Sequence, residues 1–551
     1  MNREESIALF ERCEAARRQA LDAGRNEVQA HEAAKAVWNA WAEPLIAERK
    51  ALEKAGKWEV AKQFDASRGA FAPAGKNAET AVLLHRSEIN LISLRFVPRA
   101  SVEHELQRGN GVGGAGAKIR TIYNETEFIS FVGYIFPGNA WFNDSTFSAD
   151  TFFIAVEFSG AAGFIKASFL GESWFSEATF LEEVRFSKVP FADDCRFDGA
   201  IFSGDAWFSD ATFSGVVGFD GARFSGDAWF GRVMFFGRTY FDTANFYGNA
   251  LFSGSRFFGN ASSVAHFVQA IFFGQAEFDC VTFTGDALFQ DAIFERYATF
   301  GASTFASKAS FTAIDAKRAF DLAGADFETE VPDFTQAHFE EAPRLDNIAV
   351  PKVPFWAGAR DKDEASRFQA LKRLAIQGHD HVREQEFFAG ELRCRRSDHP
   401  LRFELMKAGV VDGGRLFFAG LRREAIWSFP YDLLSAHGRS IWRPLAGLAA
   451  SIWFAAEGYE SLAGDVTTCP DKLESAWFLA LKNGLLFLGS GQKTEVEAAY
   501  QCLYGVGKAN GGMNYEGLPA AVGYLGIGQG IVSAIFIFLA LLALRNLFKI
   551  K

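Results

Sequence analysis

Phenylalanine recurs through the middle of the chain at steps that alternate between five and six residues. Alanine often stands two residues before the ring, at positions 206, 211, 222, 228, 244 and 250. Neither the 3.6-residue period of a helix nor the two-residue period of a long strand produces such steps. The pattern predicts a solenoid of short repeated units. Its clearest run is Phe197, Phe202, Phe208, Phe213, Phe219, Phe224, Phe230, Phe235, Phe241, Phe246, Phe252 and Phe257.

Composition supports a repeated aromatic slot in the core. The 551 residues include 60 Phe against 11 Tyr and 12 Trp, and an ordinary globular core has no reason to prefer one aromatic residue so strongly. In the expected coil, Phe and the small residue before it point inward, while polar residues and Gly take the corners. Coils stacked about 4.8 Å apart would place each ring on the ring of the next coil. We therefore expect these Phe residues to be core, and none of them is a functional candidate.

This arrangement resembles the pentapeptide-repeat family over roughly residues 136–340. The resemblance implies a mainly β solenoid, a right-handed quadrilateral β-helix with about 22 residues per coil and about nine coils, on the order of 40 Å long. The pattern departs from regularity in two places. After Phe257 the next strong Phe is Phe267, where we expect a bulge or a corner loop. After Phe311 the Phe slots decay, as expected of a terminal coil.

The segments that flank the repeats read as α-helical. We expect a helical N-terminal segment (1–75), a linker and N-terminal cap (76–135), the β-helix (136–345), a helical cap or spacer (346–430) and a membrane domain (431–551). The first of these has an apolar stripe, which favours a helical hairpin that packs on itself or covers the first coil. A partner-binding helix is the alternative. The stripe consists of Trp38, Trp41, Leu45, Leu52 and Trp58.

The C-terminal region is apolar enough to enter a membrane. Residues 521–545 are long enough to cross a hydrocarbon core. Residues 440–460 are a poorer candidate because Arg443 and Pro444 interrupt them, yet we expect a second crossing there and thus a C-terminal transmembrane helical hairpin. Between the two lies SAWFLALKNGLLFLG, which is apolar but too short to span and fits a re-entrant or an interfacial helix.

Basic residues predict the orientation of these crossings. They precede the first crossing and follow the second, which favours a multi-pass protein of the bacterial inner membrane with the solenoid and both termini in the cytoplasm. These residues are Arg422, Arg423, Arg439, Arg443, Arg545, Lys549 and Lys551.

The same orientation sorts the cysteines. Cys469 and Cys502 fall in the outer loop, where an oxidising compartment predicts a disulfide between them. The other four cysteines of the chain remain on the cytoplasmic side, namely Cys13, Cys195, Cys280 and Cys394.

The sequence indicates no catalytic, metal or cofactor site. The glycines of residues 108–120 have a GxGxxG spacing, but they follow a charged segment rather than an apolar strand. A metal site would draw on His379, Asp380, His381 and Glu384. On a helix, however, the two histidines lie on different faces, and Asp380 suits a helix N-cap. We predict no enzymatic activity, no bound metal and no cofactor.

Charge narrows the choice of partner. The formal net charge is −11, and residues 140–328 hold about 24 acidic against about 12 basic residues, so we expect an acidic outer wall. Nucleic acid is disfavoured as a partner because phosphate neutralisation needs clustered Lys and Arg.

We expect a membrane-anchored, non-enzymatic scaffold whose rigid acidic β-helix binds an unidentified protein partner. The lipid bilayer and, through the membrane helices, a second copy of the chain are the further expected partners. The first alternative is an ion-channel-like or transport-related protein, although no TVGYG-like filter follows the short apolar helix. The resemblance also allows a gyrase-type DNA mimic.

Overall fold

The fold was analysed in a computed structural model of the full chain. It describes residues 2–65, 70–91, 94–98, 120–124, 128–259, 264–354, 359–395, 431–436, 438, 440–463, 471–485, 493–506, 508–509, 512–513 and 518–549. The chain divides into two compact units, Met1–Pro351 and Lys352–Lys551. The glycine-rich stretch 108–119 and Cys469 lie outside the described residues.

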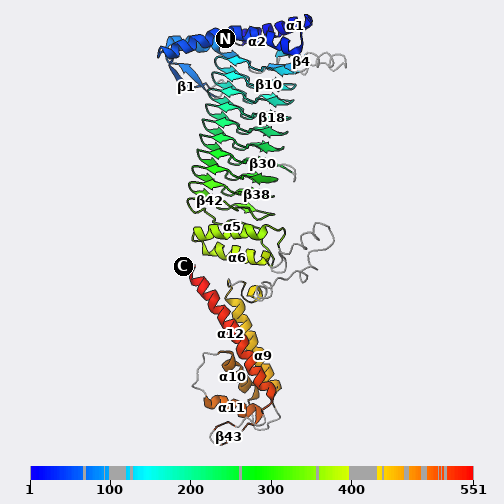
Figure 1. The fold of residues 1–551 in the computed structure, drawn as a ribbon, viewed down its shortest axis with the longest axis vertical. Coiled ribbons are helices and arrows are strands. Elements are labelled where there is room, and N and C mark those ends of the chain that lie inside the picture. The colour runs from blue at the N-terminus through cyan, green and yellow to red at the C-terminus, as the bar shows by residue number, and fades with distance from the viewer. Residues whose placement is uncertain are drawn as a thin grey trace. The chain divides into compact units, whose positions relative to one another are not determined.

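The first unit is a four-sided β-solenoid with helices at its N-terminal end (Figure 1). Its strands are two or three residues long over most of the solenoid, and most of them pair in parallel with the strand 22 residues further on, as Thr151 does with Ser173. The strands form four parallel sheets of 9, 10, 10 and 11 strands, which we call sheets I, II, III and IV. Going along one coil, the chain passes from sheet III to IV, then to I and II.

The strand bounds follow, sheet by sheet. Sheet I contains β6 (Ile129–Ser130), β10 (Thr151–Phe152), β14 (Ser173–Trp174), β18 (Cys195–Arg196), β22 (Val217–Gly218), β26 (Thr239–Tyr240), β30 (Val264–His266), β34 (Asp286–Leu288) and β38 (Ala309–Ser310). Sheet II contains β7 (Ile135–Phe136), β11 (Glu157–Phe158), β15 (Thr179–Phe180), β19 (Ile201–Phe202), β23 (Arg223–Phe224), β27 (Asn245–Phe246), β31 (Ile271–Phe272), β35 (Ile293–Phe294), β39 (Asp315–Ala316) and β42 (His338–Phe339). Sheet III contains β3 (Ile89–Asn90), β8 (Ala140–Trp141), β12 (Ala162–Gly163), β16 (Val184–Arg185), β20 (Ala206–Trp207), β24 (Ala228–Trp229), β28 (Ala250–Leu251), β32 (Ala276–Glu277), β36 (Ala298–Thr299) and β40 (Phe320–Asp321). Sheet IV contains β4 (Leu94–Pro98), β5 (Arg120–Asn124), β9 (Thr146–Phe147), β13 (Ser168–Phe169), β17 (Pro190–Phe191), β21 (Thr212–Phe213), β25 (Met234–Phe235), β29 (Arg256–Phe257), β33 (Thr282–Phe283), β37 (Thr304–Phe305) and β41 (Asp326–Phe327).

Stacked phenylalanine rings fill the interior of the solenoid. Phe208 lies 4.9 Å from Phe230 in the next coil, with an angle of 1° between the rings. Within a coil the same ring meets Phe219 edge to face, at 5.4 Å and 88°. Each such aromatic pair adds about 0.5 to 1.5 kcal/mol beyond the burial of its area. The expected aromatic core is therefore present, and it runs through the whole stack of coils.

Two kinds of corner explain the alternation of five and six. Between Phe208 and the next inward residue, Ala211, the chain makes a tight two-residue turn whose second residue, Asp210, has φ 61°. After Phe213 the chain instead takes three residues, 214–216, to reach the next face. A tight turn thus gives a step of five and a wider corner gives a step of six. Since the two kinds alternate, the left-handed turn residue recurs every 11 residues, as at Asp210, Gly221, Arg232, Thr243 and Gly254.

The irregular spacing after Phe257 is taken up between β29 and β30 without loss of register. There the pairing offset grows from 22 to 26, because Tyr240 pairs with His266. Phe241 still stacks on Phe267 at 4.9 Å. The insertion therefore lies at a corner, and residues 260–263 within it are outside the described part of the chain.

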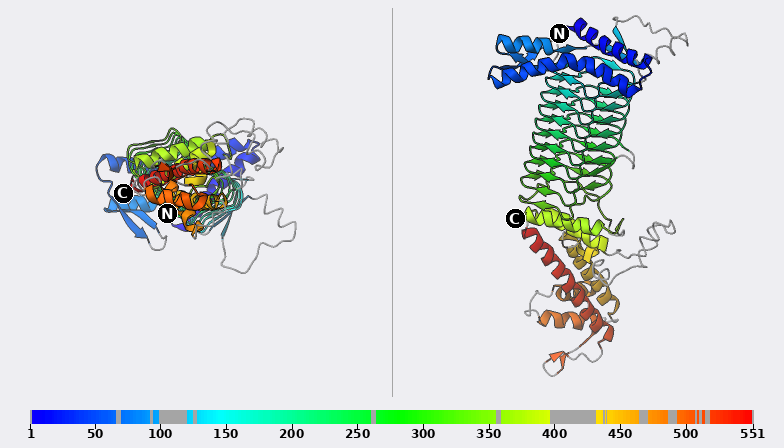
Figure 2. Two further views of the ribbon diagram at one scale, coloured as in Figure 1. Left: turned by 90° about the horizontal axis from the view of Figure 1, so that it is seen from below. Right: turned by 45° about the horizontal axis from the view of Figure 1, so that its top comes forward.

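Helices cover the first coil of the solenoid, as the helical-hairpin expectation proposed. These are α1 (Arg3–Asp22) and α2 (Glu27–Lys54), which pack together and lie across the N-terminal end of the strands (Figure 2, right). The carbonyl groups at the free edge of this coil accept hydrogen bonds from both helices, and Arg17 of α1 donates to Ser130 O at 3.4 Å. Trp38 Nε1 donates to Ile135 O at 2.7 Å, and His31 Nε2 lies 2.9 Å from Val132 O. The helices thus satisfy backbone groups that a preceding coil would otherwise pair.

The expectation of helix throughout residues 1–75 is wrong for its last part. Residues 60–75 form an antiparallel hairpin of β1 (Val60–Asp65) and β2 (Ala70–Gly75). Pro73 and Gly75 disfavour a helix there. After α3 (Ala78–Ser87), the strands β3 and β4 pair with β8 and β9. Part of the expected linker therefore extends sheets III and IV.

The second unit begins with a helical pair. Helix α5 (Glu364–Gln377) ends at Gly378, and α6 (His381–Arg395) packs against it. Asp380 Oδ1 accepts hydrogen bonds from the backbone N–H groups of Val382 and Arg383, at 3.1 and 3.0 Å. Asp380 is therefore an N-cap, as its sequence position predicted.

The rest of the second unit is a group of packed helices. These are α9 (Trp442–Ser461), α10 (Lys472–Gly484), α11 (Lys493–Tyr504) and α12 (Ala520–Lys549), with a small hairpin of β43 (Lys508–Ala509) and β44 (Gly512–Met513). Helices α9 and α12 are antiparallel, since Gly447 lies against Phe536 and Gly458 against Leu525.

Within the described residues, α12 is the one helix that is long and apolar enough to cross a membrane, over Ala520–Asn546. Helix α9 forms where the first crossing was expected and is long enough to cross, but it is less apolar than α12. Arg443, Glu457 and Glu460 lower its mean hydropathy. The transmembrane hairpin and the multi-pass topology are therefore not confirmed, while α12 is consistent with a link to a membrane.

Replacement of Trp38 by Phe tests the covering role of α2. The variant keeps a ring on the first coil but leaves the carbonyl of Ile135 without its donor, which should cost about 1 to 3 kcal/mol. Hydrogen exchange of the amides in residues 129–135 should become faster. Trp58→Phe is the control, because Trp58 is half-buried beneath the Arg49 guanidinium and its ring is retained. Unchanged protection in Trp38→Phe would contradict this account of the edge.

Replacement of Thr243 by Gly tests the strain in the tight turns. Thr243 is a β-branched residue at φ 56°, a backbone region that Gly adopts without strain. We expect Thr243→Gly to raise the free energy of unfolding by about 1 kcal/mol. Thr212→Gly, on strand β21, should instead lower it by a similar amount. Denaturant unfolding of both variants measures the difference, and a loss of stability in Thr243→Gly would refute the argument.

Candidate functional site

The outer surface of the solenoid is the candidate functional site, because the inward positions are closed. The twelve Phe residues of the clearest repeat run, Phe197 to Phe257, are at most 5% exposed. The functional candidates are therefore the side chains that project outward from the four sheets and from the corners between them.

One column of outward aspartates hydrogen-bonds consecutive coils to each other. Asp198 Oδ1 accepts from the backbone N–H of Asp220 at 3.2 Å, and Asp220 Oδ1 accepts from that of Asp242 at 3.1 Å. Asp242 Oδ1 accepts from Val268 N–H at 2.8 Å. Gly218 makes room for the first of these, because a Cβ atom there would lie 2.2 Å from Asp198 Oδ1. These carboxylates therefore accept backbone hydrogen bonds in addition to giving the surface negative charge.

A second column repeats this arrangement at another corner. Asp205, Asp227 and Asn249 each accept a hydrogen bond from the backbone N–H of the equivalent residue one coil later, at 3.1, 2.8 and 3.0 Å. Asn replaces Asp here without loss of the bond, since the amide oxygen is an equally good acceptor. Part of the acidity of the wall therefore has a structural cause.

Stacking the carboxylates changes their proton affinity. Burial, together with the charges of Asp198 and Asp242, raises the pKa of Asp220 to about 6 from its ordinary value of 3.8. Burial also raises the pKa of Asp198. Asp210 behaves in the opposite way, because hydrogen bonds from Arg232 at 2.8 and 3.0 Å lower its pKa. The ionised side chains of Asp198, Asp220 and Asp242 thus repel each other along the column.

Aromatic side chains also form close pairs on the outside, three of them stacked and one tilted by 34°. Phe236 and Tyr247 are 48% and 50% exposed, and each directly follows a strand of the same coil. One pair belongs to each of the four sheets, and each pair has one member in the coil of residues 228–249; we call the eight residues the aromatic belt. The pairs are Trp207 with Trp229 (4.5 Å), Phe236 with Phe258 (4.8 Å), Tyr240 with His266 (4.8 Å) and Tyr247 with Phe273 (4.8 Å).

Sequence reasoning missed the belt because it treated every Phe of the repeat as core. Strand residues alternate between the two faces, so the second Phe of a doublet must point outward when the first points inward. The doublets at 235–236, 257–258 and 272–273 were the available signal. On sheet III the Arg185 guanidinium lies 5.1 Å from the Trp207 ring, which extends the belt with a cation–π contact.

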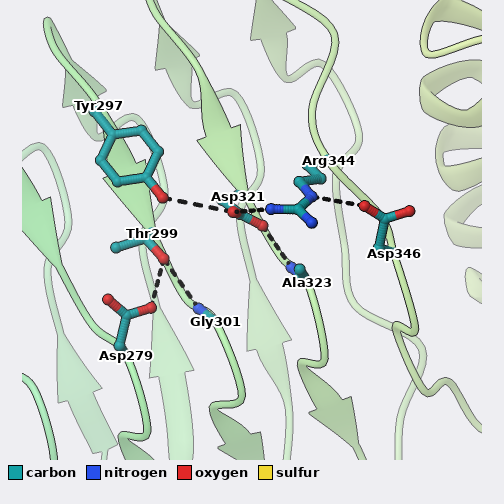
Figure 3. A network of polar contacts seen from close by, with 8 residues as sticks. All are labelled: Asp279, Tyr297, Thr299, Gly301, Asp321, Ala323, Arg344 and Asp346. Carbon is teal, nitrogen blue, oxygen red and sulfur yellow. Dashed lines mark hydrogen bonds and ion pairs between the residues drawn. The ribbon is translucent and has the colours of Figure 1, made fainter.

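Polar groups close the C-terminal coils, where Figure 3 shows one network. The Thr299 hydroxyl donates to Asp279 at 2.5 Å. Asp321 accepts from the backbone N–H of Ala323 at 2.7 Å and from Arg344 at 3.3 Å. Arg344 also binds Asp346, at 2.6 Å. These acidic groups have partners within the protein, so the network stabilises the end of the solenoid.

The residues considered for a metal site have other roles in the structure. Asp380 caps α6, while His381 Nδ1 lies 3.0 Å from Glu384 on the next turn. Among the described residues, no group of three or more His, Cys, Asp or Glu side chains is arranged to hold a metal ion.

The two cysteines assigned to the outer loop are only partly described. Cys502 is disulfide-bonded. Cys469 lies outside the described residues, so the pairing of Cys469 with Cys502 stays a prediction. The cysteines assigned to the cytoplasmic side, Cys13, Cys195, Cys280 and Cys394, are not disulfide-bonded.

These observations define a four-sided parallel β-solenoid with a phenylalanine core. The family described as pentapeptide repeats (9 copies) matches the chain at residues 153–201 and 197–244, which lie inside the solenoid. The chain thus carries Phe-centred pentapeptide repeats, and a solenoid of this kind is typical of non-enzymatic interaction scaffolds. No curated protein and no solved structure matches the chain.

Asp220→Asn tests the repulsion in the aspartate column. Because the folded-state pKa of Asp220 is raised, its ionisation opposes folding as pH rises from 3.8 through about 6. Asn keeps the acceptor for Asp242 but cannot ionise. We expect the variant to be more stable than wild type at pH 7 to 8, on the order of 1 kcal/mol after solvent screening, with no gain below about pH 4.

Asp210→Asn is the matched control for this prediction. The pKa of Asp210 is lowered, so its contribution exists above pH 3.8 and disappears as pH falls through the folded-state pKa. This variant should lose stability at neutral pH and none in acid. Denaturant unfolding at several pH values gives both curves, and curves of the same sign would refute the electrostatic account.

Proposed function

We propose that this protein is a non-enzymatic scaffold, held at the bacterial inner membrane by its C-terminal helices, whose cytoplasmic solenoid binds another protein. The aromatic belt is the observation that carries the proposal. Exposed aromatic side chains are enriched at protein interfaces, where they bury large areas at low entropic cost. A belt of paired rings on a rigid stack of coils is thus preorganised for binding.

The charges around the belt favour a basic partner surface. Asp205, Asp210, Asp227 and Asp242 lie in the coils that contribute belt residues, and residues 140–328 as a whole are acidic. A partner with Lys or Arg around an apolar patch would complement this surface and would be steered towards it.

Membrane anchoring rests on α12 and, as a proposal, on α9. Helix α12 exposes a row of large apolar side chains, and α9 exposes Trp442, Leu445, Trp453 and Phe454, which suit lipid better than water. A helix of 20 residues is about 30 Å long, close to the thickness of the hydrocarbon core. The row on α12 consists of Tyr524, Ile527, Ile531, Ile535, Phe538 and Leu541.

Crosslinking in membranes tests the scaffold proposal. Phe236→Ser with Tyr247→Ser removes two exposed belt residues without opening the core. We expect at least a tenfold loss of the crosslinked partner recovered from membranes of the producing cells, measured by mass spectrometry. The matched control is Leu170→Ser with Leu181→Ser, because these leucines are 51% and 41% exposed in the same two columns, three coils away.

The control variant should retain the partner. Recovery of the chain alone, or equal loss in both variants, would contradict the proposed role of the belt.

A channel-like or transport-related function is the second candidate. One observation favours it, namely that the short helix α10 packs against both α9 and α12, as a pore helix does between two crossings. Reconstituted vesicles should then show ion flux that disappears when residues 465–524 are replaced. Absence of flux in vesicles that contain the intact protein would remove this candidate.

A further inference from the structure

Helix α10 is fixed beside α12 by one face. Its buried residues Ala476, Leu479 and Ala480 point into the helical group, and Gln529 Nε2 of α12 donates to Ala480 O at 2.6 Å. About one turn further along α10, Asn483 Nδ2 donates to the Tyr459 hydroxyl of α9 at 2.8 Å. These contacts hold α10 at a defined level and rotation relative to the candidate membrane span.

The surface of α10 that remains uncovered divides into an apolar and a polar side. Leu473 and Leu481 are 55% and 41% exposed, and the half-buried Trp477 lies between them at four-residue spacing. Successive residues in such a series drift by only about 40° around a helix, so the three form one stripe. Ser475 and Lys482, both half-buried, are seven residues apart and share the opposite side. The exposed Glu474 stands in the first turn, at the edge of the stripe beside Leu481.

Helix α10 meets α12 in the first half of the apolar span, nearer to Ala520 than to Asn546. Gln529 lies nine residues after Ala520, which corresponds to about 14 Å along the helix axis. Around this level α12 exposes Tyr524 and Ile527, at 76% and 66%. The apolar stripe of α10 is therefore continuous in depth with a part of α12 that also needs an apolar environment.

We propose that α10 is an interfacial helix, with the stripe of Leu473, Trp477 and Leu481 inserted at the boundary of lipid headgroups and acyl chains and with Ser475 and Lys482 facing water. This inference rests on the proposed membrane anchoring and names the surface through which α10 contacts lipid. Trp is enriched at that boundary. An ammonium group beside an apolar stripe also suits a helix that binds anionic headgroups.

The two other placements of α10 conflict with its side chains. A helix in water would leave Leu473 and Leu481 exposed in a row. A re-entrant helix that reached the bilayer centre would bring Lys482 there, since it stands near the end of α10, and a central Lys costs about 2.5 to 3.5 kcal/mol even on the mildest scale. At the boundary of headgroups and acyl chains, the apolar stripe contacts lipid while Lys482 remains in water.

Spin labels on the full-length protein test the proposal. Single substitutions Leu473→Cys, Trp477→Cys, Leu481→Cys, Ser475→Cys and Lys482→Cys are made in a Cys280→Ser background, because Cys280 is an exposed free thiol. The protein is reconstituted in vesicles of phosphatidylethanolamine and phosphatidylglycerol. Collisions of each label with oxygen, which concentrates in lipid, are compared with collisions with a nickel chelate, which stays in water.

We expect the ratio of oxygen to nickel accessibility to be at least fivefold higher at the three stripe positions than at positions 475 and 482. Water-like ratios at all five positions would overturn the inference, as would lipid-like ratios at all five. A label at Phe538→Cys reports on α12, where Phe538 is 64% exposed. A water-like ratio there would instead refute the membrane anchoring itself.

Discussion

The fold depends on the contact of one phenylalanine ring with the ring one coil away. Rings such as Phe208 and Phe230 lie 4.9 Å apart, close to the spacing of hydrogen-bonded strands. A flat ring therefore fills the space between two successive coils and leaves no cavity between them. Aliphatic residues fill volume without this flatness, which explains why the core uses one aromatic residue. It also explains why the four extra residues between β29 and β30 are accommodated at a corner, where no ring must move.

The corners carry the second constraint, since backbone N–H groups there need acceptors. The columns that begin at Asp198 and Asp205 supply them from side chains, with the carboxylate of one coil bound to the amide of the next. Charge then accumulates at the spacing of the coils, and the raised pKa of Asp220 is the electrostatic consequence. A surface that is acidic for this reason is available for binding, but its acidity alone does not identify a partner.

The regular part of the fold was predictable because the repeat of Phe at steps of five and six is visible in the sequence. The Phe steps gave the solenoid, and Asp380 was recognised as a cap because capping depends on adjacent residues. Contacts between distant segments left no such local trace. Nothing near Trp38 indicates that its indole meets Ile135, 97 positions later. The belt was missed for another reason, since doublets such as Phe235 and Phe236 divide one residue type between core and surface.

Polar contacts set the arrangement of the C-terminal helices. Arg393 of α6 binds both carboxylate oxygens of Asp432, at 2.8 and 2.9 Å, and Arg443 at the start of α9 donates to the Asp432 carbonyl at 3.2 Å. At the other end of α9, Tyr459 bridges Asn483 and Gln529. In lipid, apolar helices gain no hydrophobic free energy by meeting each other, so packing and hydrogen bonds decide their positions. If α9 and α12 enter a bilayer, the contacts around Asp432 and those around Tyr459 determine the position of α9. The contacts around Tyr459 also determine the position of α10.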